Sequence, residues 1–186
     1  MIIGYRDFFL DYSYKGFRLR ARSHPYVWDA GVNEARCSTS PVLARDHLAT
    51  GSCTCGFYAF RDGSQLDKYA PVHGAVLMWG TVVEHEFGYR AEFAQLESLF
   101  FPEIAICQKA SHFVDSRDLC VFVDARPLDP YTACPACLKQ LLDYAGGYSF
   151  WWQAMTYSQV MSQIAQTYGV PLIKTHNDKI SVQFNR

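Results

Sequence analysis

The sequence has little charge and lacks the short motifs that mark several common enzyme classes. Only 19% of its residues are charged and the formal net charge is −1, so it has no excess of positive charge to drive indiscriminate binding to nucleic acid. It contains no glycine-rich phosphate loop, no G-x-S-x-G nucleophile turn and no H-E-x-x-H metalloprotease motif. General coating of nucleic acid and the mechanisms that depend on these motifs are therefore excluded.

The sequence also lacks a long apolar run and a basic leader followed by an apolar segment. No stretch approaches the roughly 20 apolar residues that span a bilayer. We therefore expect a cytoplasmic protein that is neither exported nor inserted in a membrane. The chain has seven cysteines, and in a reducing compartment metal binding explains them better than a disulfide framework does.

Apolar and aromatic residues are plentiful, at 49% and 16% of the 186 residues, which is the composition of a chain that folds around a core. Alternating apolar residues predict a hairpin over residues 5–22 and strands over 57–61, 72–86, 89–96 and 119–123. Helical spacing and capping residues predict helices over 134–145 and 156–168, and a closing hairpin joins 172–174 to 180–184. We predict an α+β fold with a central twisted antiparallel sheet or partly closed β-barrel, a zinc-ordered loop on it, and two C-terminal helices packed outside.

A group of metal-binding residue types lies in the least regular part of the chain. Cys37, His47, Cys53 and Cys55 fall within nineteen positions of one another. Zinc prefers four tetrahedral sulfur and nitrogen ligands, and its binding can order a loop that has no core of its own. We predict a structural zinc site here, while Cys53 and Cys55 as small buried strand residues remain the simpler alternative.

A second pair of thiols, Cys134 and Cys137, stands at the start of a predicted helix. One alternative joins this pair to Cys53 and Cys55 as a four-thiolate zinc site. Another is a redox dithiol, because the helix dipole lowers the pKa of a thiol at its N-terminus. A third is that the pair is only structural. Two further cysteines are expected to be core residues, namely Cys107 and Cys120.

Arginines and aromatic residues suggest a surface for nucleic acid. Arginines at alternate positions of one strand can follow phosphates, and aromatic side chains near arginines can stack on bases. The predicted ligand-binding residues are Arg18, Arg20, Arg22, Trp28, Tyr58, Trp79 and Arg90. Our leading hypothesis is a zinc-stabilised, non-catalytic binding module that recognises nucleic acid, such as a modified or flipped base. A protein-interaction module, for example a phage or host-defence factor, is the first alternative.

A third hypothesis is a small hydrolase. Glu84, His85 and Glu86 place two acids and a base on one strand, and such groups can serve in acid/base catalysis. Opposite charges also pair across a hairpin simply to stabilise a solvated sheet face. We favour the second interpretation of these residues and predict no catalytic residue.

Several longer motifs resemble a family of small uncharacterised proteins frequent in actinobacteria and their phages. The matching segments are W-x-x-G-x-x-x-A-x-C from Trp28, His47, C-x-C-G-x-Y-A from Cys53, V-x-G-x-V-x-x-W-G-x-V-x-x-H-x-x-G-Y-R-A-E from Val72, and Ile164 to Pro171. Against that family, residues 105–155 look like an addition. We therefore predict one domain over 1–186, with a β-rich zinc-containing core over 1–100 and a helix and closing hairpin over 156–186. A weaker similarity, to PUA-like β-barrels that include readers of modified bases, is an analogy of fold alone.

Overall fold

The structure is a computed structural model of the chain, and it describes residues 1–22, 26–37, 48, 54–123, 130–144 and 153–175. The zinc-ordered loop was predicted in the irregular segment 23–56, of which residues 23–25, 38–47 and 49–53 lie outside the described residues. None of the described helices is long and apolar enough to cross a membrane.

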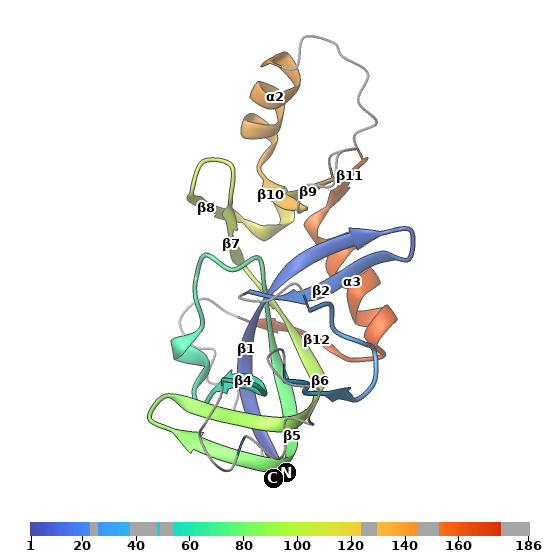
Figure 1. The fold of residues 1–186 in the computed structure, drawn as a ribbon. Helices are drawn as coiled ribbons and strands as arrows, with labels where there is room; N and C mark the ends of the chain where they lie inside the picture. The colour runs from blue at the N-terminus through green and yellow to red at the C-terminus, as the bar shows by residue number, and fades with distance from the viewer. Residues whose placement is uncertain (23–25, 38–47, 49–53, 124–129, 145–152, 176–186) are drawn as a thin grey trace.

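The largest described sheet has mostly antiparallel pairings and closes partly into a ring (Figure 1). β1 (Ile2–Ser13) pairs with β5 (Val72–His85), β5 with β6 (Gly88–Pro102), and β6 with β4 (Phe57–Phe60). β4 then pairs back with β1 at one position, where Tyr5 faces Phe60. The prediction of a central antiparallel sheet that is partly closed is confirmed.

Shorter strands extend this ring. β2 (Gly16–Ala21) pairs with the second half of β1, and β3 (Asn33–Glu34) pairs with β6. β12 (Leu172–Thr175) pairs with β6 in parallel. This strand begins where a closing hairpin was predicted, and the predicted second strand over 180–184 lies outside the described residues.

The predicted hairpin near the N-terminus is confirmed as β1 and β2. Phe17, Leu19 and Ala21 are buried, and the arginines between them lie on the opposite face and are half-buried, as the alternation along a strand requires. Gly16 ends the turn with a φ of 89°, a backbone conformation that side chains other than glycine rarely adopt. The hairpin therefore has one apolar face and one basic face.

The long hairpin of β5 and β6 contains a bulge that the sequence marks with a glycine. The register shifts between Trp79 and Val82, and Gly80 has a φ of 79°. The buried carboxylate of Glu92 accepts a hydrogen bond from the backbone N–H of Thr81 at 3.1 Å. Glu92 therefore satisfies a backbone donor that the bulge leaves without a strand partner.

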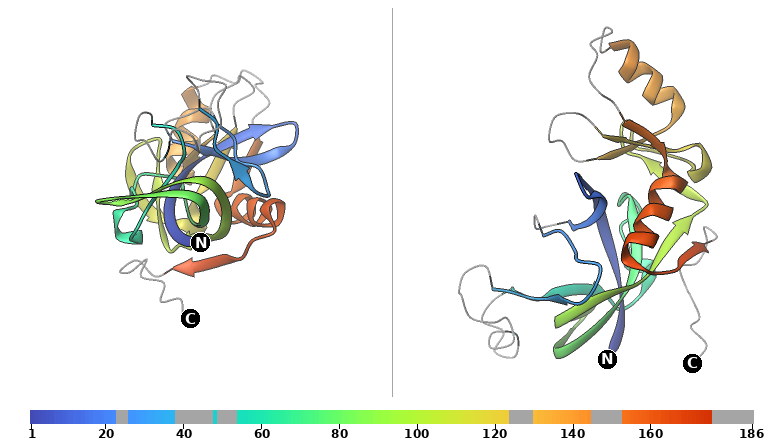
Figure 2. Two further views of the ribbon diagram at one scale, coloured as in Figure 1. Left: turned by 60° about the horizontal axis from the view of Figure 1, so that its bottom comes forward. Right: turned by 90° about the vertical axis from the view of Figure 1, so that its right-hand side faces the viewer.

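The core lies inside the ring and continues beneath the C-terminal helix. Trp28 is fully buried, and its ring meets Phe8 and Phe57 edge to face. The helix α3 (Tyr157–Tyr168) packs on β2 and β6, and Figure 2 shows it beside the sheet. Its Thr156 N-cap forms a capping box, and Gly169 ends it in the left-handed conformation.

The segment between β6 and α3 forms separate small sheets at the end of the molecule farthest from the N-terminus (Figure 1). β7 (Ile104–Cys107) pairs with β8 (His112–Asp115), and β9 (Cys120–Val123) pairs with β10 (Tyr131–Ala133) and β11 (Gln153–Thr156). The helix α2 (Pro135–Tyr144) follows β10. Two short 3-10 helices complete the described elements, η1 (Gly63–Gln65) and η2 (Ser116–Asp118). The predicted addition over 105–155 spans nearly these elements, and its status as an addition stays a prediction.

Candidate metal centre

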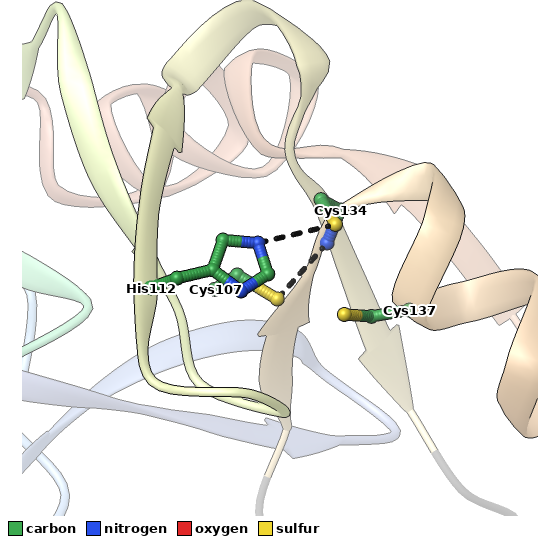
Figure 3. Close-up of side chains that lie close together, drawn as sticks. All are labelled: Cys107, His112, Cys134 and Cys137. Atoms are coloured by element: carbon green, nitrogen blue, oxygen red, sulfur yellow. Dashed lines mark hydrogen bonds between the residues drawn. The ribbon is translucent and has the colours of Figure 1, made fainter.

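Four side chains that can bind a metal ion meet between two strand pairs and a helix (Figure 3). Cys107 ends β7 and His112 begins β8, and the two residues face each other across that hairpin. Cys134 lies between β10 and α2, and Cys137 lies in the first turn of α2. A hairpin and a helix N-terminus therefore each contribute two ligands.

The spacing of the ligand atoms suits a small ion with four ligands. The three sulfur atoms and a ring nitrogen of His112 all lie within 4.8 Å of one another. The Nε2 atom of His112 is 3.5 Å from Sγ of Cys134. With zinc–sulfur bonds of about 2.3 Å, a tetrahedral site separates its sulfur atoms by about 3.8 Å. Movements of about 1 Å would bring the four atoms to zinc distances.

The two thiols at the helix differ in acidity. The backbone N–H of Cys137 is the main cause that lowers the pKa of Cys134 to about 7, and His112 adds to the effect. Burial is the main cause that raises the pKa of Cys137 to about 11, and the neighbouring thiols raise it further. One thiolate therefore forms readily near neutral pH, whereas Cys137 needs a nearby cation to ionise.

Buried hydrogen bonds hold the two halves of the cluster together. Thr132, on β10, is fully buried, and its hydroxyl donates to the carbonyl of Ile106 at 2.6 Å. The backbone N–H of Gln108 donates to the carbonyl of Thr132 at 2.9 Å, and the N–H of Thr132 donates to the Gln108 side chain, also at 2.9 Å. Because these bonds flank Cys107 and Cys134, they fix the distance between the two pairs of ligands. The N–H of Cys134 also donates to Sγ of Cys107 at 3.3 Å.

The composition of the cluster favours a structural role for a bound ion. Three thiols and one imidazole complete a tetrahedral shell, which leaves no position for a reacting water or substrate. Cys107, Cys134 and Cys137 are buried, and His112 is exposed. A metal ion held here would join the β7–β8 hairpin to α2.

The structure places the predicted metal ligands in two regions. Cys37 and Cys55 line one cavity of about 350 Å³ beside Trp28, while His47 and Cys53 lie outside the described residues. Cys134 and Cys137, the second half of the alternative four-thiolate site, have Cys107 and His112 as their close neighbours.

Sequence reasoning missed two of the four clustered residues. Cys107 was expected to be only a core residue, and it is indeed fully buried. The spacing C-x4-H from Cys107 to His112, followed by C-x2-C, is a signal that would have found the cluster. Paired ligands with short internal spacing are typical of zinc sites.

The predicted arginines on β2 and directly after it have different surroundings. Arg18 is largely buried, donates to the Trp28 carbonyl at 2.6 Å, and forms an ion pair with Asp29 at 3.4 Å. Arg20 is half-buried, and its guanidinium lies 5.9 Å from the centre of the Phe9 ring. Arg22 is exposed and forms an ion pair with Asp67. Arg20 and Arg22 are thus more accessible to a ligand than Arg18 is.

The other predicted ligand-binding residues are also spread over the fold. Trp28 is fully buried in the core, and Trp79 is half-buried and stacks on Phe93. Arg90 is buried and donates to the Leu48 carbonyl at 3.2 Å. Tyr58, in contrast, is 43% exposed. It is the most accessible aromatic residue of the predicted set.

Glu84, His85 and Glu86 lie at the exposed end of the β5–β6 hairpin. Glu84 forms an ion pair with Arg61 at 2.5 Å, and the same guanidinium donates to the His85 carbonyl at 3.1 Å. Glu86 lies in the turn. An ion pair with the residue that follows β4, and not a pairing across the β5–β6 hairpin, therefore accounts for Glu84.

A second site is a cavity of about 310 Å³ that we call the aromatic cavity. It lies where β1 meets β4, next to the turn between β5 and β6. Its lining includes Tyr5, Arg6, Arg22, Tyr58, His85 and Phe87. Arg22, Tyr58 and His85 had been singled out from the sequence, whereas Arg6 had not.

Comparison of the chain with protein-family models, with curated proteins and with solved structures gives no match.

Proposed function

We propose that the chain is a zinc-stabilised, non-catalytic binding module that recognises nucleic acid, such as a modified or flipped base. The observation that carries this proposal is the aromatic cavity, where arginine and aromatic side chains line one hollow of the surface. Aromatic side chains stack on unpaired bases, and arginines bind phosphates or base edges. The resemblance to the uncharacterised actinobacterial and phage family is consistent with this proposal and assigns no activity.

In this proposal zinc has a structural role. The ion binds Cys107, His112, Cys134 and Cys137, and it holds α2 on the β7–β8 hairpin. The second C-terminal helix, α3, packs on β2 and β6 of the largest sheet. Zinc–thiolate binding supplies folding energy directly, so we expect β7, β8 and α2 to lose their ordered structure when zinc is removed.

Arg22 is the first proposed phosphate contact because it is exposed, and Arg20 is the second, whereas Arg18 is largely buried and donates to the Trp28 carbonyl. The ion pair of Arg22 with Asp67 is on the surface, where such pairs contribute little to stability and exchange partners easily. Arg22 also borders the aromatic cavity. A nucleic-acid strand whose phosphates contact Arg22 would therefore bring a base close to Tyr58.

Oligonucleotide binding tests the proposal. Dissociation constants for modified and unmodified oligonucleotides, single-stranded and duplex, should rise steeply between about 50 and 200 mM salt. Arg22→Gln should weaken binding and reduce the slope of log affinity against log salt by about 1. Arg117→Gln is the control, because Arg117 is an exposed arginine paired with Asp115 at the other end of the molecule. Binding that is absent, or that does not depend on salt, would contradict the proposal.

A protein-interaction module is the second candidate, and an exposed aromatic pair favours it. Tyr69 and Phe113 are 49% and 45% exposed, and their ring centres are 5.9 Å apart. The ammonium of Lys68 lies 5.1 Å from the centre of the Tyr69 ring. A pulldown that still recovers a protein after nuclease digestion, and loses it with Phe113→Ala, would favour this candidate over nucleic-acid binding.

A further inference from the structure

The aromatic cavity forms at the weakest point of the ring of strands. β1 and β4 pair only at Tyr5 and Phe60 among the described residues. The ladder between these two strands is therefore short, and side chains next to the pair border an opening in the ring. The turn between β5 and β6 borders the opening with His85 and Phe87. Its volume of about 310 Å³ is at the lower end of the range for small-molecule sites, which suits one nucleotide.

The walls suit a flat, aromatic ligand. The rings of Tyr58 and His85 both line the cavity and are nearly parallel, with an angle of 19° and 6.3 Å between their centres. Phe87 lies at the rim and is 58% exposed. A ring that stacks in this orientation would cover apolar surface that now contacts water.

Arg6 gives the cavity a group that can only donate hydrogen bonds. One terminal nitrogen of its guanidinium donates to the Tyr58 carbonyl, and its face lies 5.4 Å from the centre of the Trp28 ring. Its Nε atom is buried and has no hydrogen-bond partner among the described residues. Burial lowers the pKa of Arg6 to about 10, so it stays charged at neutral pH. The arginine can only donate, so the group that satisfies it must accept.

The balance of charge at the cavity excludes a cationic ligand. Arg6 and Arg22 both border it, with Asp7 as the acidic group. Asp7 is buried, and both of its oxygens already accept the backbone N–H of Asp67, at 3.2 and 3.1 Å. Arg22 is paired with Asp67, so the charge of Arg6 is the one that favours an anion or a neutral ring that carries acceptors.

From these observations we infer that the aromatic cavity binds a single guanine-type nucleotide, with the base stacked on Tyr58 and Arg6 donating to the acceptors of the base. Guanine presents two adjacent acceptors, O6 and N7, whereas adenine replaces one of them with a donor. The inference rests on the proposed function, since it assigns the cavity to one unstacked base.

Isothermal titration of the purified, zinc-loaded protein with GMP and with AMP tests this inference. We expect GMP to bind more tightly than AMP by roughly tenfold, because an arginine paired with guanine is worth at least that ratio. Phe87→Ala should weaken GMP binding by roughly tenfold, because the Phe87 ring at the rim would no longer cover the base that stacks on Tyr58. Tyr14→Ala is the control, because Tyr14 is an exposed aromatic residue in the turn between β1 and β2 and lies outside the cavity. Arg6→Lys should reduce the preference for GMP, because lysine keeps the charge and loses the planar pair of donors.

The outcomes separate the cavity from the wider proposal. GMP binding without oligonucleotide binding would support the cavity and contradict the nucleic-acid module. Oligonucleotide binding that is unaffected by Phe87→Ala, with no binding of GMP, would overturn the cavity and leave the module standing. Equal binding of GMP and AMP, or a preference for AMP, would also overturn the inference. If Arg6→Lys does not fold, Phe87→Ala still decides, because it alters an exposed turn residue.

Discussion

Replacing Thr132 with valine should loosen the metal centre without touching a ligand. Valine keeps the shape of threonine and removes only the hydroxyl, which donates to the Ile106 carbonyl at 2.6 Å and lies 3.3 Å from the Gln108 side-chain oxygen. The residue next to Ile106 is Cys107, and Cys134 is two residues beyond Thr132. The hydroxyl therefore connects the two halves of the cluster.

The size of the effect follows from burial. Thr132 is fully buried, so water cannot replace the lost hydrogen bond, and the free energy of unfolding should fall by about 1–3 kcal/mol. Groups that orient metal ligands typically alter metal affinity by about 10- to 100-fold when they are removed, and we expect a loss in that range. Thr132→Ser is the matched control, because it keeps the hydroxyl and loses one methyl group, worth about 1 kcal/mol.

The assay has two parts. Competition with a coloured chelator gives zinc affinity, and urea unfolding at fixed free zinc gives stability. Thr132→Val should bind zinc more weakly than Thr132→Ser, although both variants are destabilised. If the two variants bound zinc equally well, the hydroxyl would have no role in positioning the ligands, and this account of the cluster would be refuted.

Three further predictions concern the partly closed ring of strands and the residues packed on it. Each is measured by urea unfolding. Tyr157→Phe should lower the free energy of unfolding by about 1–2 kcal/mol, because the buried hydroxyl donates to the Pro71 carbonyl at 2.6 Å; an unchanged midpoint would contradict this. Gly88→Ala should cost at least about 2 kcal/mol, since a Cβ there would lie 2.0 Å from the Ala59 carbonyl oxygen, and a smaller loss would mean that the strands adjust freely. Burial is the main cause that raises the pKa of Asp7, so the folded state holds its proton more tightly than the unfolded state does. The stability of the parent relative to Asp7→Asn should therefore fall as pH rises from about 4 toward the folded-state pKa, and a difference that does not vary with pH would contradict it.

The sequence predicted best where local chemistry decides the structure. Alternation between buried and outward residues located the β1–β2 hairpin, because a strand buries every second side chain. The bulge at Gly80 shows what local chemistry does not predict. It depends on the Glu92 carboxylate of β6, which accepts a hydrogen bond from the backbone of β5.

Each half of the metal centre has a local spacing signal, but the meeting of the two halves was harder to predict. His112 and Cys134 are brought together by strand pairing and by the Thr132 hydrogen bonds, none of which is visible in local spacing. Cysteines that are close in sequence, such as Cys53 and Cys55, drew attention instead. Arg18 shows the same limit, because its partner Tyr168 lies 150 positions away.

Elemental analysis of the purified protein tests the central claim, namely that Cys107, His112, Cys134 and Cys137 hold a zinc ion. Cys137→Ser should lose one zinc per chain relative to the parent protein, and Cys120→Ser should lose none, because Cys120 is a half-buried cysteine on β9 outside the cluster. The comparison between variants holds even if Cys37, His47, Cys53 and Cys55 bind a second ion. A parent protein without zinc, or a Cys137→Ser variant with the zinc content of the parent, would contradict the account.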